Sequence, residues 1–374
     1  MKVRQERWSA NEGWRHPGDG DDAQLVLVFG DRASIVHPHL AAALTARWPT
    51  AAIVGGSTAG QIIGTEVFDA GIVATAIHFD HTEIRVATAP VTAVDSAAAG
   101  AAMAQTLADP DLVHVLVISE GLDINGEALV RGLGGRLPTS VSVTGGLSAD
   151  GELFQETVVL HSGGIHRNTV VAVGFYGTRL KVGYGSLGGW DPFGPERQIT
   201  KSAGNVLYEL DGQSALALYK SYLGDHASDL PASGLLFPLS LRTRDASAPV
   251  VRTILSVDEA DQSLTFAGDV PVGGYVRLMK ANFDRLIDGA VGAGRISAEA
   301  LGMPVDLALL ISCVGRRMVL RQRVEEEVEG VRDIVGPGAA IAGFYSYGEI
   351  SPFTPTARCE LHNQTMTVTT LSER

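Results

Sequence analysis

One unit recurs three times along the chain, and it constrains the fold more than any other feature. In each copy a short apolar run leads through a polar loop and a helix-like stretch to a second apolar run with a glycine-rich ending. The first copy opens with Leu25–Phe29, the second with Val113–Ile118 and the third with Leu307–Ile311. A strand–helix–strand unit of this kind predicts a right-handed crossover between two parallel strands.

The glycine-rich endings of the three copies are themselves related. Residues 55–62 and 343–350 both follow the pattern Gly-x-x-(Ser/Thr)-x-Gly-(Gln/Glu)-Ile, and residues 145–151 carry a variant with one extra residue. Helices are expected at residues 40–47, 127–133 and 324–334. The last of these is the best defined, because its apolar residues form one stripe: Val324, Val328, Val331 and Val335.

Strand-like segments follow each unit, and a further set between residues 250 and 279 precedes the third. We therefore predict an α/β protein with two related halves, in which mixed β-sheets are covered by helices. The predicted boundaries are a flexible tail at 1–22, an N-terminal domain at 23–203 and a C-terminal domain at 204–374.

Composition excludes several classes of protein. The formal net charge is −13 and there is no basic stripe, which argues against a nucleic-acid partner. Two cysteines, Cys313 and Cys359, cannot form a disulfide framework and fit a reducing compartment. No apolar run approaches the ~18 residues that a membrane span needs. We expect a cytoplasmic protein without membrane insertion.

Several strings in the C-terminal half are long enough to be specific. Residues 312–317 read Ser-Cys-Val-Gly-Arg-Arg, residues 343–352 read Gly-Phe-Tyr-Ser-Tyr-Gly-Glu-Ile-Ser-Pro, and residues 359–367 read Cys-Glu-Leu-His-Asn-Gln-Thr-Met-Thr. With residues 189–195 and 205–212, they resemble the FIST family, whose members carry an N-terminal and a C-terminal FIST domain in tandem. The resemblance covers almost the whole chain after the tail.

The resemblance implies an intracellular sensory protein of signal transduction that binds a small ligand such as an amino acid. Some family members resemble haem-based nitric-oxide sensors that regulate histidine kinases, so haem is a cofactor to test. In larger relatives the module is fused to output domains. This chain has no room for one, so we expect it to signal to a separate partner, such as a histidine kinase or a cyclase.

Candidate ligand-binding residues lie where strands are expected to end, beside helix N-termini. Arg316 and Arg317 could clamp a carboxylate or a haem propionate. The alternative is that both arginines pair with residues 325–327, and that the tyrosines cap the core. The remaining candidates supply stacking and polar contacts, with core packing as the alternative for the tryptophan: Trp190, Tyr345, Ser346, Tyr347, Glu349 and Asn363.

Two histidines are candidate axial ligands for haem iron. His362 has a strand-like position, from which a neutral imidazole can bind iron. The alternative is a buried histidine in a polar network with Asn363 or Gln364. His226 is the second candidate, although its loop-like setting favours a surface role.

No convincing catalytic constellation is present. A hydrolase elbow needs Gly-x-Ser-x-Gly, but residues 56–60 have Thr at the centre, and Ser148 lacks the final glycine. A Ser- or Cys313-dependent hydrolase or transferase is therefore a weak alternative. The pattern Gly183-x-Gly185-x-x-Gly188 runs into two prolines, which block the helix that a dinucleotide site requires. We predict a binding protein rather than an enzyme.

Overall fold

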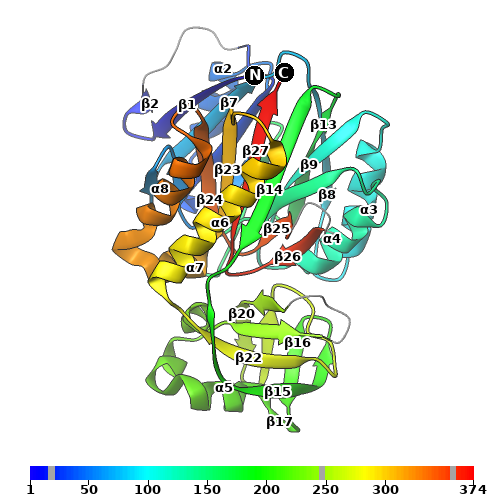
Figure 1. Cartoon of the computed structure of the whole chain (residues 1–374), viewed down its shortest axis with the longest axis vertical. Helices are drawn as coiled ribbons and strands as arrows, with labels where there is room; N and C mark the ends of the chain where they lie inside the picture. Colours follow the sequence, from blue (N-terminus) through cyan, green and yellow to red (C-terminus); the bar gives the residue numbers. More distant parts are fainter. Residues whose placement is uncertain (16–21, 244–248, 354–358) are drawn as a thin grey trace.

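In the computed structural model, which describes residues 1–15, 22–243, 249–353 and 359–374, each repeated unit forms a pair of parallel strands (Figure 1). These pairs confirm the parallel arrangement predicted from the repeat. Their bounds are β3 (Leu25–Gly30) with β4 (Ala52–Ser57), β9 (Leu112–Ser119) with β10 (Ser142–Leu147), and β23 (Leu307–Cys313) with β24 (Ala340–Ser346).

Helical segments join the two strands of each unit. Side-chain caps fix where two of them begin: Asp31 accepts a hydrogen bond from the backbone N–H of Ser34, and Asn125 accepts one from that of Ala128. The third unit contains a helix that the sequence did not predict, directly after β23. The bounds are α1 (Arg32–Ile35), α2 (Leu40–Arg47), α4 (Gly126–Gly134), α7 (Val314–Leu320), η3 (Arg321–Arg323) and α8 (Val324–Val335).

Each parallel pair is extended by antiparallel strands into a mixed sheet, as predicted. Three sheets result, with the orders β12-β11-β4-β3-β7-β1-β2, β26-β25-β10-β9-β13-β8 and β14-β27-β23-β24-β5-β6. The added strands outside the edge hairpins are β1 (Lys2–Ser9), β2 (Gly13–Arg15), β7 (Ile72–His78), β8 (Glu83–Pro90), β13 (Thr169–Tyr176), β14 (Leu180–Leu187) and β27 (Met366–Glu373).

The three sheets exchange their edge hairpins in a cycle. The hairpin after the first unit pairs with β24, the hairpin after the second pairs with β4, and the hairpin after the third pairs with β10. No unit therefore completes its own sheet, and both halves of the sequence contribute to the sheets of β9 and β23. The hairpins are β5 (Gln61–Ile63) with β6 (Glu66–Phe68), β11 (Val159–His161) with β12 (Gly164–His166), and β25 (Glu349–Pro352) with β26 (Cys359–His362).

A shared apolar core lies between the three sheets. Phe29, Ile118 and Phe344 belong to it, one from each unit, and the rings of Phe29 and Phe344 lie 4.5 Å apart. Helices cover the outer faces, among them α3 (Ser96–Leu107) and α6 (Phe283–Leu301). The three sheets and the helices that cover them form the larger part of the molecule, which we call the body. Burial of its apolar side chains is the main favourable term in its folding.

The elements from β15 to β22 form a separate, smaller lobe, which is drawn below the body in Figure 1. It has its own apolar core under a curved sheet of order β19-β18-β22-β15-β16-β21-β20. Two chain connections reach it, residues 188–190 and 281–282. Its elements are β15 (Asp191–Ala203), β16 (Val206–Leu210), β17 (Gln213–Ser214), α5 (Ala215–Leu223), η1 (Gly224–Asp229), η2 (Ala232–Leu236), β18 (Leu239–Arg242), β19 (Val250–Arg252), β20 (Ile254–Asp258), β21 (Ser263–Phe266) and β22 (Tyr275–Lys280).

Two of the predicted boundaries look different in the structure. The flexible tail expected at 1–22 is wrong for its first part, because β1 pairs with β7 from Lys2 to Trp8 and buries Trp8. Residues 16–21 lie outside the described part. The domain boundary at 203/204 falls in the turn between β15 and β16, inside the lobe, and it stays a prediction.

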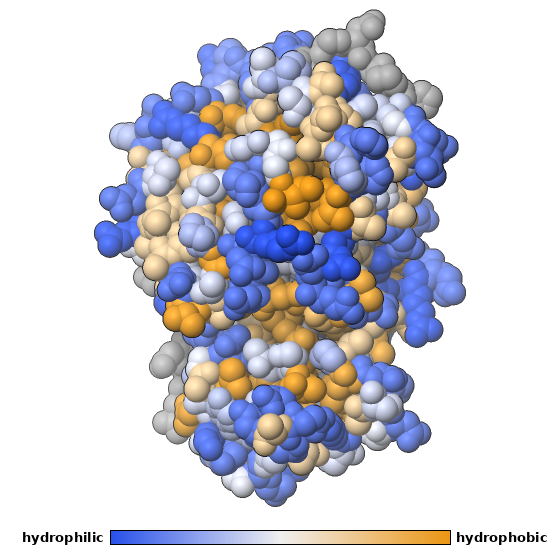
Figure 2. Space-filling model, turned by 180° about the vertical axis from the view of Figure 1, so that it is seen from behind, coloured by the Kyte–Doolittle hydropathy of each residue, from blue (hydrophilic) through white to orange (hydrophobic). Residues whose placement is uncertain are grey.

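The face seen in Figure 2 is mostly hydrophilic, with separate apolar patches, and the outline of the molecule narrows between body and lobe. Among the described residues, no helix combines the length and the apolar character that crossing a membrane requires.

Corresponding glycines in the three units allow the parallel strands to approach closely. A Cβ at Gly55, Gly145 or Gly343 would overlap the backbone oxygen of Val28, Val117 or Leu310 on the neighbouring strand. We expect Gly343→Ala to lower the free energy of unfolding by about 1–3 kcal/mol, because the strand must shift to relieve the overlap. Urea denaturation measures this. Gly338→Ala, where an added Cβ meets nothing within 4 Å, is the matched control; equal stabilities would contradict the close approach.

Candidate ligand-binding site

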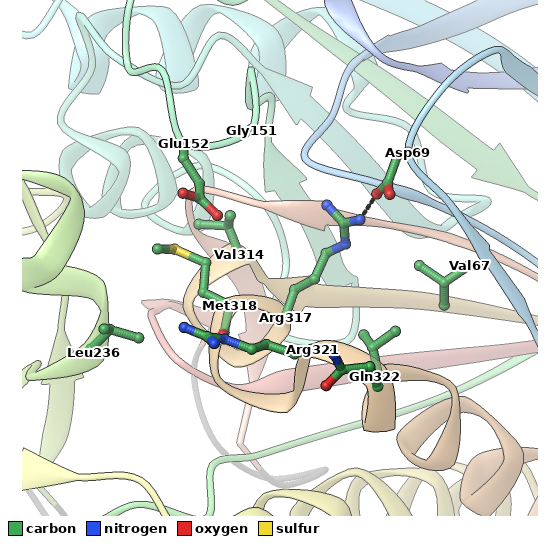
Figure 3. Close-up of a pocket in the computed structure, with 11 residues that line it drawn as sticks. Val67, Asp69, Gly151, Glu152, Leu236, Val314, Arg317, Met318, Arg321 and Gln322 are labelled. Carbon is green, nitrogen blue, oxygen red and sulfur yellow. Dashed lines mark hydrogen bonds and ion pairs between the residues drawn. The ribbon is translucent and has the colours of Figure 1, made fainter.

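A cavity of about 450 Å³ lies beside α7, where the body meets the lobe (Figure 3). One complete face of α7 lines it, because Val314, Arg317, Met318 and the following Arg321 are spaced by three and four residues. Because α7 starts directly after β23, this wall occupies the strand end at which ligands are expected in an α/β sheet.

The other walls come from segments far apart in the sequence. Val67 lies in β6 of the exchanged hairpin, Asp69 directly follows it, and Gly151 and Glu152 follow β10. Leu236, at the end of η2, is the contribution of the lobe. The cavity thus touches all three units and the lobe, so that a bound molecule would contact each of them.

Arg317 is the central polar side chain of this cavity. Its Nη1 donates to the backbone oxygen of Ala59, and its Nη2 pairs with the carboxylate of Asp69, which is 77% exposed. The Nε is buried and has no acceptor among the described residues. Burial lowers the pKa of Arg317 below its usual value, although a guanidinium stays charged in proteins. The ring of Tyr345 lies 5.7 Å from the guanidinium carbon.

Charges of both signs face the cavity. Arg317 and Arg321 are cationic, Asp69 and Glu152 are anionic, and Val314, Met318 and Leu236 supply apolar surface (Figure 3). Because Asp69 is mostly exposed, water screens its attraction to Arg317, and the pair contributes little to stability. An incoming carboxylate can therefore replace Asp69 on the guanidinium at small cost. The chemistry of the lining suits a small molecule with separate anionic, cationic and apolar parts.

Arg316 lies in a different place from its neighbour. It is fully buried, and its Nε and Nη2 both donate to Oε2 of Glu327, at 3.1 and 2.7 Å. Its Nη1 donates to the oxygen of Gly188, and its Nη2 to that of Leu286. The sequence left open whether the two arginines bind a ligand or pair with residues 325–327. Arg316 pairs with Glu327, whereas Arg317 reaches the cavity.

Glu327 is equally buried and accepts four hydrogen bonds. Besides the two from Arg316, its Oε1 accepts from the hydroxyls of Ser312, at 3.1 Å, and Tyr345, at 2.7 Å. Burial, and next the adjacent Glu327 carboxylate, raise the pKa of Tyr345 well above its usual value. Tyr345 therefore stays a hydroxyl donor, and the network holds β23, β24, α7 and α8 together.

Tyr347 and Ser346 are also inside the body rather than in the cavity. The hydroxyl of Tyr347 donates to Asp150, and its ring stacks on Phe154 at 4.5 Å. Ser346 contacts Glu349 with 2.5 Å between Oγ and Oε1. These side chains fix the loops after β10 and β24, and the loop after β10 carries the cavity residues Gly151 and Glu152.

Asn363 and Trp190 join the body to the lobe. The Oδ1 of Asn363 accepts from the N–H of Thr253, and its Nδ2 donates to the oxygen of Tyr347. The Nε1 of Trp190 donates to the oxygen of Gln364, 3.0 Å away. Gln364 in turn donates to the oxygen of Leu235 in the lobe. Direct ligand contacts of these residues stay predictions.

The two candidate axial histidines lie in different surroundings, and His362 is closed off inside the body. His362 is 1% exposed, its Nε2 lies 2.7 Å from the oxygen of Ser351, and its ring packs edge-on against Phe353 at 4.0 Å. Burial lowers the pKa of His362 to about 4, so the ring is neutral. The Nδ1 has no hydrogen-bond partner among the described residues. His226 is exposed on η1, with its ring 5.5 Å from Phe237.

Cys313 is not placed as a nucleophile. It is fully buried at the end of β23, and burial raises the pKa of its thiol far above the usual value, which opposes formation of a thiolate. Among the described residues, no group of three or more His, Cys, Asp or Glu side chains could hold a metal ion.

Sequence reasoning placed Arg317 near a ligand but missed the rest of the cavity. We expected residues 312–317 to form a loop, whereas α7 begins at Val314. The spacing of Val314, Arg317, Met318 and Arg321 would have indicated one face of a helix. No sequence signal connects Asp69, Glu152 and Leu236, which meet only through the exchange of hairpins and the docking of the lobe.

Comparison with known proteins agrees with the tandem organisation. Residues 24–213 match the FIST N domain, and residues 215–352 match the FIST C domain. An uncharacterized protein of Methanocaldococcus jannaschii is 24% identical over 204 residues, which cover 51% of this chain and 39% of that protein. The matched stretch therefore spans well under half the length of that relative.

Glu349 makes stability depend on pH. It is fully buried, and burial raises its pKa from 4.5 to about 8, against the lowering effect of its hydrogen bonds to Ser346 and Thr365. Between these values the folded carboxyl keeps a proton that the unfolded chain has released, so the free energy of unfolding falls as pH rises.

We expect Glu349→Gln, which mimics the protonated carboxyl, to make this fall shallower between pH 5 and 8, by on the order of a few kcal/mol. Denaturation at several pH values measures the difference. Glu299→Gln, at an exposed position of α6, should leave the slope unchanged; identical slopes for all three proteins would show that Glu349 is ionised in the fold.

Proposed function

We propose, because the chain belongs to the FIST family, that it is a sensory protein of signal transduction that binds a small ligand in the cavity beside α7. FIST domains are associated with sensing small ligands, and tandem FIST N and FIST C domains cover most of this chain. Binding acts as a signal if the ligand has different affinities for two conformations of the protein.

The observation that carries the proposal is the state of Arg317. Its guanidinium faces a cavity of about 450 Å³, its charged partner Asp69 is mostly exposed, and its Nε–H finds no acceptor in the described part of the chain. A buried donor without an acceptor costs free energy. A carboxylate that draws the guanidinium into the cavity would form a charge-assisted, bidentate contact and relieve that cost.

The remaining lining favours an amino acid with an apolar side chain. Arg317 and Arg321 would hold the carboxylate, and Glu152 and the displaced Asp69 would face the ammonium group. Val314, Met318 and Leu236 would contact the side chain. The cavity volume falls within the range that small-molecule sites occupy, roughly 300–1,000 Å³.

The finer alternatives receive less support. A haem-based nitric-oxide sensor needs an accessible axial ligand, whereas His362 is buried with its Nε2 at the oxygen of Ser351, and His226 lies on the lobe away from the cavity. A Cys313-dependent hydrolase or transferase needs an accessible thiolate. A cytoplasmic location and a separate histidine kinase or cyclase as the partner belong to the proposal, and they rest on the family and on the composition.

Calorimetric titration with L-leucine, L-methionine and L-valine tests the proposal. We expect at least one of them to bind, and Arg317→Gln to weaken that binding at least about tenfold, since it removes a charge-assisted contact of about 1.4 kcal/mol or more. Arg295→Gln removes an exposed charge on α6, away from the cavity, and should leave the affinity unchanged.

Two results would overturn the proposal. One is the absence of binding by any of the three amino acids to a folded protein. The other is equal affinity of the wild-type protein and Arg317→Gln, which would place the bound molecule elsewhere.

A further inference from the structure

One side chain bonds to the first connection between body and lobe and to the helix that follows the second connection. The first connection begins at Gly188, and the second leads into the first turn of α6, which contains Leu286. The backbone oxygens of these two residues accept hydrogen bonds from Nη1 and Nη2 of Arg316, at 2.8 and 2.6 Å. Arg316 is fully buried, so water does not compete for these bonds.

The same helix that carries Arg316 lines the cavity. Arg316 lies almost opposite the face of α7 formed by Val314, Arg317 and Met318, because successive residues of a helix are turned by about 100°. One side of this seven-residue helix therefore meets the ligand cavity, and the other side meets the two connections.

A second contact joins α7 to the lobe. Gly315 lies so close to Gln364 that a Cβ would overlap its side-chain amide. That amide donates to the oxygen of Leu235, which precedes the cavity residue Leu236. If α7 shifted, it would therefore displace the lobe at two places: near the connections between body and lobe, and at η2.

We propose that α7 transmits occupancy of the cavity to the lobe, and that Arg316 is the positioning residue that couples them. This inference rests on the proposed function for its ligand. When a carboxylate draws Arg317 into the cavity, α7 moves as a unit, and Arg316 carries the oxygens of Gly188 and Leu286 with it. Glu327 fixes the charged end of Arg316, so the movement is passed to the backbone rather than absorbed by the side chain.

The test measures binding and lobe position separately. Spin labels on Ser228→Cys in the lobe and Glu329→Cys in the body, both exposed positions, report the distance between the two parts. The probe is whichever of L-leucine, L-methionine and L-valine binds in the calorimetric titration, and we expect it at saturation to shift this distance in the otherwise wild-type protein. In Arg316→Lys we expect the same amino acid still to bind but the shift to be lost, because one ammonium cannot reach Glu327 and both oxygens.

Arg332→Lys is the matched control. Arg332 also donates to two backbone oxygens, those of Gly336 and Ala339, but it lies at the other end of α8. Its substitution should preserve the distance shift. If Arg316→Lys does not fold, Ser312→Ala replaces it, since that change removes one hydrogen bond to Glu327 and should reduce the shift.

Hydrogen exchange without ligand separates the two proposals. We expect amides of residues 188–190 and 283–287 to exchange at least about tenfold faster in Arg316→Lys than in Arg332→Lys. Binding without any distance shift in the wild-type protein would overturn the coupling and leave the proposed function intact. Absence of binding would overturn the proposed function, and equal exchange in the two variants would overturn the role of Arg316.

Discussion

The exchange of edge hairpins is the constraint on which the rest of the body depends. A parallel pair such as β3–β4 leaves one edge of β4 without partners, and unpaired edge groups are costly when buried. Here each open edge is filled by a hairpin from another unit. The three sheets are thereby tied into a ring around one apolar core, and the loops that follow β4, β10 and β24 are brought together. The cavity exists because of this exchange: Asp69 and Glu152 reach α7 only through hairpins and loops of other units.

The buried ion pair of Arg316 and Glu327 lies beside the cavity, and its position has a separate explanation. Removing Arg316 and Glu327 from water is expensive, and their attraction offsets that cost only if the remaining donors and acceptors are also bonded. The backbone oxygens of Gly188 and Leu286 and the hydroxyls of Ser312 and Tyr345 meet this requirement. An apolar pair could fill the same space, but it could not bond two connecting segments to one helix. The arrangement therefore favours a defined position of the lobe more than it favours stability.

Much of the body could be predicted from periodicity, but the location of the site could not. Local pattern specifies β3, β9 and β23 with their helices, since apolar runs and glycine-rich endings are short-range signals. Hairpin exchange is a long-range choice that leaves no mark within a unit. Arg316 and Arg317 looked equivalent for a different reason: residues 312–317 were expected to form a loop, whereas on α7 a turn of about 100° directs Arg316 into the core and Arg317 into the cavity. The strand β1 was missed because Val3 and Trp8 are the only apolar residues of Lys2–Ser9, so that the segment lacks the alternation of apolar and polar residues that predicts a strand.

The residues that carry the family resemblance acquire a physical role from this geometry. Asn363 and Gln364 lie in the turn between β26 and β27, and they bond to the lobe, to Tyr347 and to the oxygen of Leu235. Trp190 closes the same turn from the first connection. These contacts build the joint beside the cavity rather than its lining. A sensor needs such a joint as much as it needs a ligand contact. Binding shifts the equilibrium between two conformations only if the ligand has a different affinity for each of them.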